Sequence, residues 1–172
     1  PNTIRLFATG SRLAEPEETE SGPEAHAPTE AGDAETLSEG EAMVEIKRLM
    51  GEITRTIEEA ARTAEPQSKF SMYLRAGQLK IADRFPFLDP FGAEFEYLGG
   101  EIAFIGKTST AEFIKGLTEA LKLAVTGVAE SSTQPARLRK HVAEDLRRLQ
   151  SRIGTELERF GLHDSIDEIV RV

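Results

Sequence analysis

The chain has 172 residues, a formal net charge of −9 and no cysteine. The lack of cysteine excludes disulfides, thiolate metal sites and thiol nucleophiles within this chain. No apolar run approaches the roughly 20 residues that a membrane-spanning helix needs. The negative charge argues against general nucleic-acid binding, which requires a cationic surface. We therefore expect a soluble chain with no membrane span and no nucleic-acid partner.

The first 35 residues divide into two segments of different charge. Residues 1–13 contain two arginines and no acid, which is typical of the end of a mitochondrial transit peptide or of the last part of an upstream segment. Residues 14–35 contain eight acidic residues and three prolines, and predict an acidic disordered linker. Residues 36–172 then form a single domain. The expected compartment is the cytoplasm, with the mitochondrial matrix as the alternative.

Helical spacing of apolar residues predicts three long helices. The first spans about 38–64, with Ser38 or Thr36 as its cap. The second spans about 109–130 and begins with the capping box Ser109-Thr110-Ala111-Glu112. The third follows Pro135 and ends at Gly161, and residues 164–170 form a short last helix. The first helix is acidic and the third is basic, which favours their pairing within one chain or between two copies. Two independently solvated faces are the alternative.

Two hairpins are predicted between the first and second helices. Their turns would be Ala76-Gly77 and Gly99-Gly100. Both registers place apolar residues on one face, which we expect to be buried, namely Phe70, Met72, Leu74, Leu79, Ile81, Phe95, Tyr97, Ile102 and Phe104. The predicted fold class is α+β: a long N-terminal helix, a four-stranded antiparallel sheet of two hairpins, and two C-terminal helices packed on one sheet face.

A Phe-rich connection, Phe85-Pro86-Phe87-Leu88-Asp89-Pro90-Phe91, joins the two predicted hairpins. Its prolines exclude a regular central strand or helix interior and hold the backbone rigid. Phe85 continues the preceding strand and is assigned to the core. Large apolar side chains on a rigid loop are typical of contact surfaces, so Phe87, Leu88 and Phe91 are the predicted interaction residues. In the competing interpretation all three fold inward and close the sheet.

A possible anion site lies at Gly106-Lys107-Thr108, between a predicted strand and a helix. A phosphate-binding P-loop ends in this tripeptide, but the glycine that it requires five residues earlier is replaced by Glu101. Residues 102–105 moreover have the pattern of a paired strand. The candidate that remains is a weaker anion contact made by Lys107, Thr108 and Ser109 at the helix start.

The other candidate groups are isolated. The histidines His26, His141 and His163 lack the spacing of metal ligands. His141 with Asp145 permits a phosphoacceptor interpretation, and Asp83 with Asp89 permits a carboxylate pair, although an Asp before Pro usually begins a turn. We therefore predict no catalytic residue, metal or cofactor.

The predicted function is a non-catalytic protein-interaction or regulatory and dimerisation module with a protein partner or a second copy, forming a homodimer. Two alternatives stay open. One is a phosphate- or nucleotide-binding enzyme that uses Lys107, and the other is a structural subunit of an organellar complex.

Overall fold

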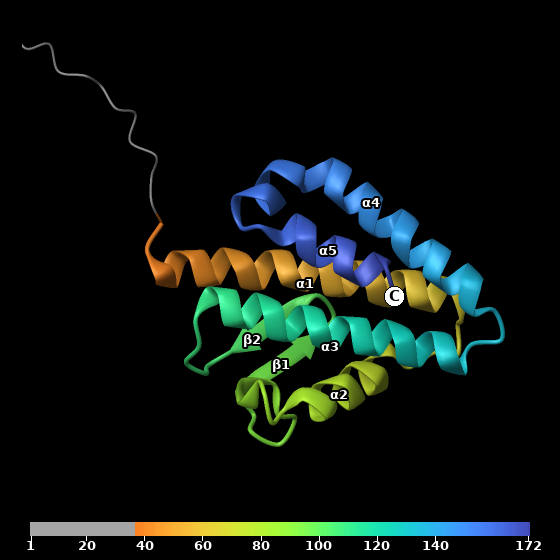
Figure 1. Ribbon diagram of the computed structural model, residues 1–172, viewed down its shortest axis with the longest axis horizontal. Coiled ribbons are helices and arrows are strands. Elements are labelled where there is room, and N and C mark those ends of the chain that lie inside the picture. The colour runs from red at the N-terminus through yellow and green to blue at the C-terminus, as the bar shows by residue number, and fades with distance from the viewer. Residues whose placement is uncertain (1–36) are drawn as a thin grey trace, which may run out of the picture. The chain divides into compact units, whose positions relative to one another are not determined.

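The computed structural model describes residues 37–172 (Figure 1). The predictions for residues 1–13 and 14–35 therefore lie outside the described part of the chain. The described elements are five α-helices, one short 3-10 helix and two strands. In chain order they are α1 (Glu39–Ala64), α2 (Phe70–Ile81), η1 (Pro86–Leu88), β1 (Phe95–Leu98), β2 (Glu101–Phe104), α3 (Thr110–Ser131), α4 (Pro135–Arg159) and α5 (Leu162–Val170).

The first predicted hairpin is wrong, because residues 70–81 form helix α2. The sheet therefore has two strands instead of four, although helices and an antiparallel sheet still combine in one fold. Helical geometry buries Phe70, Leu74 and Ile81, at positions i, i+4 and i+11, and leaves Met72 61% and Leu79 55% exposed. These two apolar residues were predicted to lie in the core.

Gly77 has a different role from the predicted turn. It lies on the buried side of α2, where a Cβ atom would stand 2.8 Å from the carbonyl oxygen of Ala120 in α3. The absence of a side chain lets α2 and α3 approach closely, and these two helices make the most extensive contact of the fold. The glycine therefore serves helix packing.

The second predicted hairpin is confirmed, including its register. Phe95 lies opposite Phe104 and Tyr97 lies opposite Ile102. The turn residues Gly99 and Gly100 have φ angles of 56° and 107°. Both central positions of a tight hairpin turn of this kind require positive φ, which glycine adopts without steric cost.

The three long predicted helices are confirmed within one or two residues at each end, although the third is kinked at Ile153, where the backbone leaves helical geometry with φ of −125° and ψ of 28°. Ser38 and Glu41 form a reciprocal capping box at the start of α1. Ser109 accepts a hydrogen bond from the backbone N–H of Glu112 at the start of α3. After α4, Gly161 adopts the left-handed conformation, with φ of 66°, and α5 follows directly.

Helix α3 lies at the centre of the fold and contacts α1, α2, α4 and α5. Its Phe113 is fully buried and joins α3 to the hairpin, with ring centroids 5.0 Å from Phe104 and 6.3 Å from Phe95. Helix α4 packs mainly on α1 and α5, across the molecule from α2 in Figure 1. Of the two long C-terminal helices, α3 therefore supplies the packing on the sheet.

Opposite charges on α1 and α4 are paired within one chain. Arg152 donates to Glu52 over 3.3 Å, and Arg48 pairs with Glu156. The pair of Glu52 and Arg152 has the predicted polarity, with the acid on α1 and the base on α4, whereas the pair of Arg48 and Glu156 has the reverse polarity. Between residues 37 and 172, none of the helices has both the length and the apolar composition that crossing a membrane requires.

Candidate functional site

The predicted contact residues of the Phe-rich connection do not all lie at the surface, because some point into the core and one points outward. Phe87 and Leu88 lie in η1 and are buried, and the Phe87 ring stacks on Phe113 with centroids 5.7 Å apart. Phe91, three residues beyond η1, is 76% exposed. The competing interpretation, in which these residues fold inward, therefore holds for Phe87 and Leu88. Phe91 lies at the surface.

Local interactions hold Phe91 in place. The backbone N–H of Phe91 donates a 2.9 Å hydrogen bond to the Asp89 side chain, the arrangement of an Asx turn. The guanidinium carbon of Arg75 lies 5.8 Å from the centre of the Phe91 ring, within cation–π range. Arg75 belongs to α2, so this contact joins the connection to that helix. Asp89 thus has the turn-forming role that the sequence favoured over a carboxylate pair.

The exposed side of α2 carries two more large apolar residues beside Arg75. Met72 precedes Arg75 by three positions and Leu79 follows it by four, which places all three on one face of the helix. Met72, Arg75, Leu79 and Phe91 are called the α2 patch below. It gathers three of the six large apolar side chains that are exposed in the described part of the chain.

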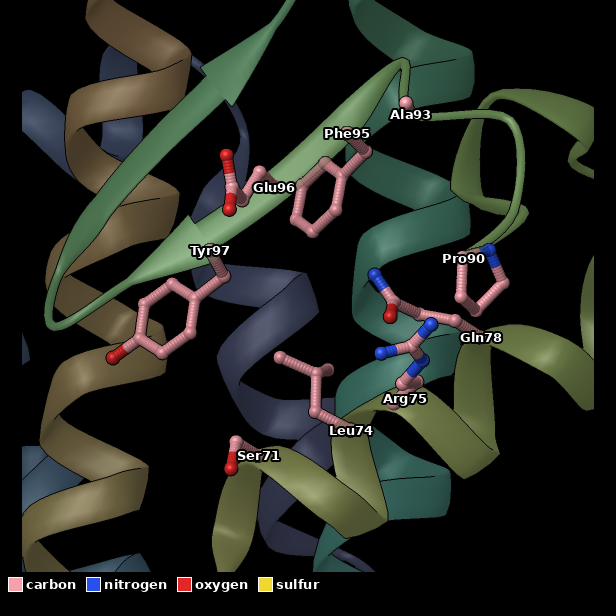
Figure 2. Close-up of a pocket in the computed structure, with 9 residues that line it drawn as sticks. All are labelled: Ser71, Leu74, Arg75, Gln78, Pro90, Ala93, Phe95, Glu96 and Tyr97. Carbon is pink, nitrogen blue, oxygen red and sulfur yellow. The ribbon is translucent and has the colours of Figure 1, made fainter.

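A groove of about 370 Å³ lies next to the patch, between α2 and β1. Figure 2 shows Leu74, Arg75 and Gln78 projecting from α2 toward the strand that carries Phe95 and Tyr97. The residues that line this α2–β1 groove are Ser71, Leu74, Arg75, Gln78, Pro90, Ala93, Phe95, Glu96 and Tyr97.

Gln78 is the most deeply buried polar side chain of the groove. It is only 7% exposed, and its amide forms no hydrogen bond with another described residue. In the described part of the chain, the fully buried side-chain polar atoms without a partner are Ser68 Oγ and Thr118 Oγ1, so the Gln78 amide still reaches the solvent of the groove. An unpaired amide that faces a groove is therefore available to a ligand.

Tyr97, at the end of the groove, has a structural partner. Its hydroxyl donates a 2.7 Å hydrogen bond to Glu58 of α1. Burial, followed by this hydrogen bond and the negative charge of Glu58, raises the pKa of Tyr97 well above its ordinary range. The phenol stays protonated at neutral pH and cannot act there as a base.

The predicted anion site is surrounded by carboxylates. Lys107 is exposed, but the Thr108 hydroxyl donates to the Glu112 carboxylate over 2.8 Å, and Ser109 caps α3. The Glu94 carboxylate lies directly against Gly106. The start of α3 thus already has negative charge from the chain itself, which disfavours an external phosphate.

Two residues of the predicted histidine sites, His163 and Asp145, have structural partners. His163 contacts the carbonyl oxygen of Gly154 at 3.1 Å, and Asp145 pairs with Arg148. Across residues 37–172, no group of three or more His, Cys, Asp and Glu side chains is arranged to hold a metal ion.

Arg75, Gln78, Met72 and Leu79 were absent from the predicted site. They were missed because residues 70–81 were assigned to a hairpin. In that hairpin Arg75 and Gln78 would lie on the solvent-exposed face of the sheet. The spacing of Phe70, Leu74 and Ile81 is compatible with a helix, but the same segment also has the alternation of a hairpin, so this signal alone does not decide between the two.

Comparisons with known proteins do not assign this site. No protein-family model matches the chain, and no curated protein or solved structure is significantly similar to it. The functional argument therefore rests on the geometry of the α2 patch and the α2–β1 groove.

Proposed function

We propose that the domain is a non-catalytic protein-interaction module that binds its partner through the α2 patch. The observation that carries this proposal is that the exposed residues Met72 and Leu79 share one helix face with Arg75, whose guanidinium lies over the exposed ring of Phe91. Exposed apolar residues that cluster are typical of interaction surfaces, and aromatic and arginine side chains are enriched among the residues that dominate binding energy.

The patch is already ordered before a partner arrives. Met72, Arg75 and Leu79 stand on a regular helix, and the Asx turn and the Arg75 contact restrain Phe91. A partner that covers these side chains therefore immobilises few new torsions, which lowers the entropic cost of binding.

The charge of α2 indicates the chemistry of the partner. The helix contains Arg75 and Lys80 and no acidic residue, although the whole chain is acidic. The complementary surface is apolar and bordered by acidic side chains. A regulatory role would follow if that partner were a signalling protein.

A second copy of the chain is the competing partner. Because two ion pairs already join α1 to α4 within one chain, we place a homodimer contact at the α2 patch instead of between those helices. A structural subunit of an organellar complex would use the same surface. The phosphate-binding alternative is less favoured, since Glu94 and Glu112 flank Lys107.

A peptide-display selection tests the proposal. A random-peptide phage library is selected on the full chain, and the affinity of the recovered peptides is measured by fluorescence anisotropy. We expect Phe91→Ser and the double variant Met72→Ser/Leu79→Ser each to weaken binding by about tenfold or more. Ile105→Ser is the matched control, because Ile105 is exposed and lies outside the patch.

Two results would contradict the proposed surface. One is peptide binding that all of these variants leave unchanged, and the other is the failure of the folded chain to enrich any peptide. Sedimentation velocity at micromolar concentration identifies the second copy as the partner if the wild type dimerises and Phe91→Ser does not.

A further inference from the structure

We propose that the free edge of β1 takes up one extended peptide segment of a partner protein, which adds to the hairpin as a third strand inside the α2–β1 groove. This inference rests on the proposed interaction function. It specifies how the partner is bound: one of its segments pairs with β1 in the groove that lies next to the α2 patch.

The register of the hairpin leaves hydrogen-bonding groups of β1 without a strand partner. The N–H of Ile105 donates to the carbonyl of Glu94 over 3.0 Å, and Phe95 lies opposite Phe104. Hydrogen-bonded pairs alternate with non-hydrogen-bonded pairs along an antiparallel ladder, so Phe95 and Tyr97 occupy non-hydrogen-bonded positions. Their N–H and C=O groups therefore point away from β2.

These backbone groups form a sheet edge without a strand partner among the described residues, and because Phe95 is only 7% exposed, the edge is reached through the groove alone. No backbone hydrogen bond from the other described elements reaches Phe95 or Tyr97. An edge with alternate free donors and acceptors is a template for another strand, and peptide recognition by strand addition uses such edges.

The groove provides the space that one added strand needs. Helix α2 packs chiefly on α3, which leaves about 370 Å³ between α2 and β1. Ligand sites commonly have volumes of about 300–1,000 Å³, and an added strand lies about 4.8 Å from its neighbour. The volume of the groove lies at the lower end of this range, so the space suits one extended segment, with α2 as its far wall, and not a larger element.

Gln78 gives the groove a group that recognises peptide backbone. Gln78 as a whole residue is 7% exposed, and its side-chain amide is unpaired among the described residues. The amide combines one carbonyl acceptor with an NH₂ donor, and each peptide unit of a bound strand offers the complementary pair. A peptide segment satisfies both halves of this amide, whereas an apolar ligand would leave them unpaired.

Charges on the two walls define the occupant further. Arg75 on α2 and Glu96 on β1 line the groove, and neither forms an ion pair with another described residue. The complementary segment is an extended peptide with an acidic side chain facing Arg75 and a basic side chain near Glu96.

A second copy of the hairpin does not fit this edge as well. In a symmetric pairing of two β1 edges, each strand would have to enter a groove that the other molecule's α2 closes on the far side. A single unpaired segment meets no such obstacle. The geometry therefore favours a flexible segment of a partner protein.

Backbone methylation of a bound peptide tests the inference directly. The probe is a peptide selected from the random library on the full chain, and a series of analogues carries one N-methyl group at successive positions. Strand addition predicts that methylation weakens binding by about tenfold at every second residue only, because alternate N–H groups face β1. Hydrogen exchange of the Phe95 and Tyr97 N–H groups should slow on binding.

Side-chain variants give a second and independent readout. Gln78→Ala should weaken peptide binding by about tenfold without lowering the melting temperature, because the amide has no partner in the free protein. Gln67→Ala is the control, since Gln67 is exposed and lies outside the groove.

The outcomes separate the two proposals. Alternating loss on methylation with protection of Phe95 and Tyr97 supports strand addition. Peptides that bind and depend on Phe91, but show no alternation and no protection, overturn strand addition and leave the α2 patch as the contact surface. Peptide binding that needs neither Phe91 nor Gln78 overturns both, as does the absence of enriched peptides. Dimerisation that protects Phe95 and Tyr97 would replace the partner peptide by a second copy.

Discussion

The hydroxyl of Tyr97 in β1 donates a 2.7 Å hydrogen bond to the carboxylate of Glu58 in α1. This bond ties the hairpin to the long N-terminal helix, and it lies at the end of the α2–β1 groove. Burial is the main reason that the pKa of Tyr97 is raised, and Glu58 raises it further. The protonated phenol is therefore a structural part of the folded state.

The contribution of Tyr97 to stability should depend on pH. In the unfolded chain Tyr97 titrates near its ordinary pKa of 10.0, and in the folded protein it titrates at a higher pH. The folded state then binds the proton more tightly, so its stabilising effect is complete below about pH 10 and is lost as the pH rises toward the folded pKa. The stability gap between wild type and Tyr97→Phe should narrow over that range in urea unfolding experiments.

The control for this titration is Tyr73→Phe, which removes the other tyrosine of the chain. In that background the tyrosinate absorbance reports Tyr97 alone, and its midpoint should lie above pH 10. A midpoint at the ordinary pKa in the folded protein would contradict the role of Tyr97.

Leu88→Ala and Phe91→Ala should differ in their effect on the free energy of unfolding. Leu88 is completely buried, so its truncation should lower the free energy of unfolding by about 2–5 kcal/mol. Phe91 is exposed, and its truncation should change stability by about 0.5 kcal/mol or less. Chemical denaturation of both variants measures this. Similar losses for the two variants would show that Phe91 also belongs to the core.

Gly51→Ala and Gly40→Ala, both in α1, form a matched pair. A Cβ atom at Gly51 would overlap the carbonyl oxygen of Gly100 at the hairpin turn, whereas nothing lies within 4 Å of a Cβ at Gly40. We expect Gly51→Ala to destabilise the fold by about 1–3 kcal/mol. Gly40→Ala should be neutral or stabilising by up to about 1 kcal/mol, because alanine favours helix. Equal melting temperatures would contradict the close packing of the turn on α1.

Deletion of residues 1–35 should leave the melting temperature of the domain nearly unchanged. The expectation comes from composition, since residues 14–35 are acidic and rich in proline and have little apolar surface to bury. Differential scanning calorimetry of the full and shortened chains provides the comparison. A large drop on deletion would show that the folded domain depends on this segment.

Elements with strong local signals were predicted correctly. The capping residues Ser38 and Ser109 accept hydrogen bonds from backbone N–H groups three residues ahead, and the double glycine at 99–100 adopts the positive φ angles of the turn. Such features act over short distances, so the sequence pattern is sufficient to locate the element that they begin or turn.

Residues 70–81 could not be assigned from their pattern alone. Apolar residues at 70, 72, 74, 79 and 81 fit the alternation of a hairpin, and a subset of them also fits the spacing of a helix. Packing decided between the two. Gly77 lets α2 lie against Ala120 of α3, and this contact buries Phe70, Leu74 and Ile81 together.

The location of the candidate site also depends on whether residues 70–81 form a hairpin or a helix. The long helices, the Gly-Gly hairpin and the rigid Phe-rich connection follow from local backbone chemistry, so the residues alone were enough to predict them. Long-range packing placed Leu88 in the core, set Phe91 against Arg75, and turned Gln78 toward a groove beside a free strand edge. These relationships join residues of different elements, and a helix in place of the first hairpin is what brings them together and leaves the edge of β1 free.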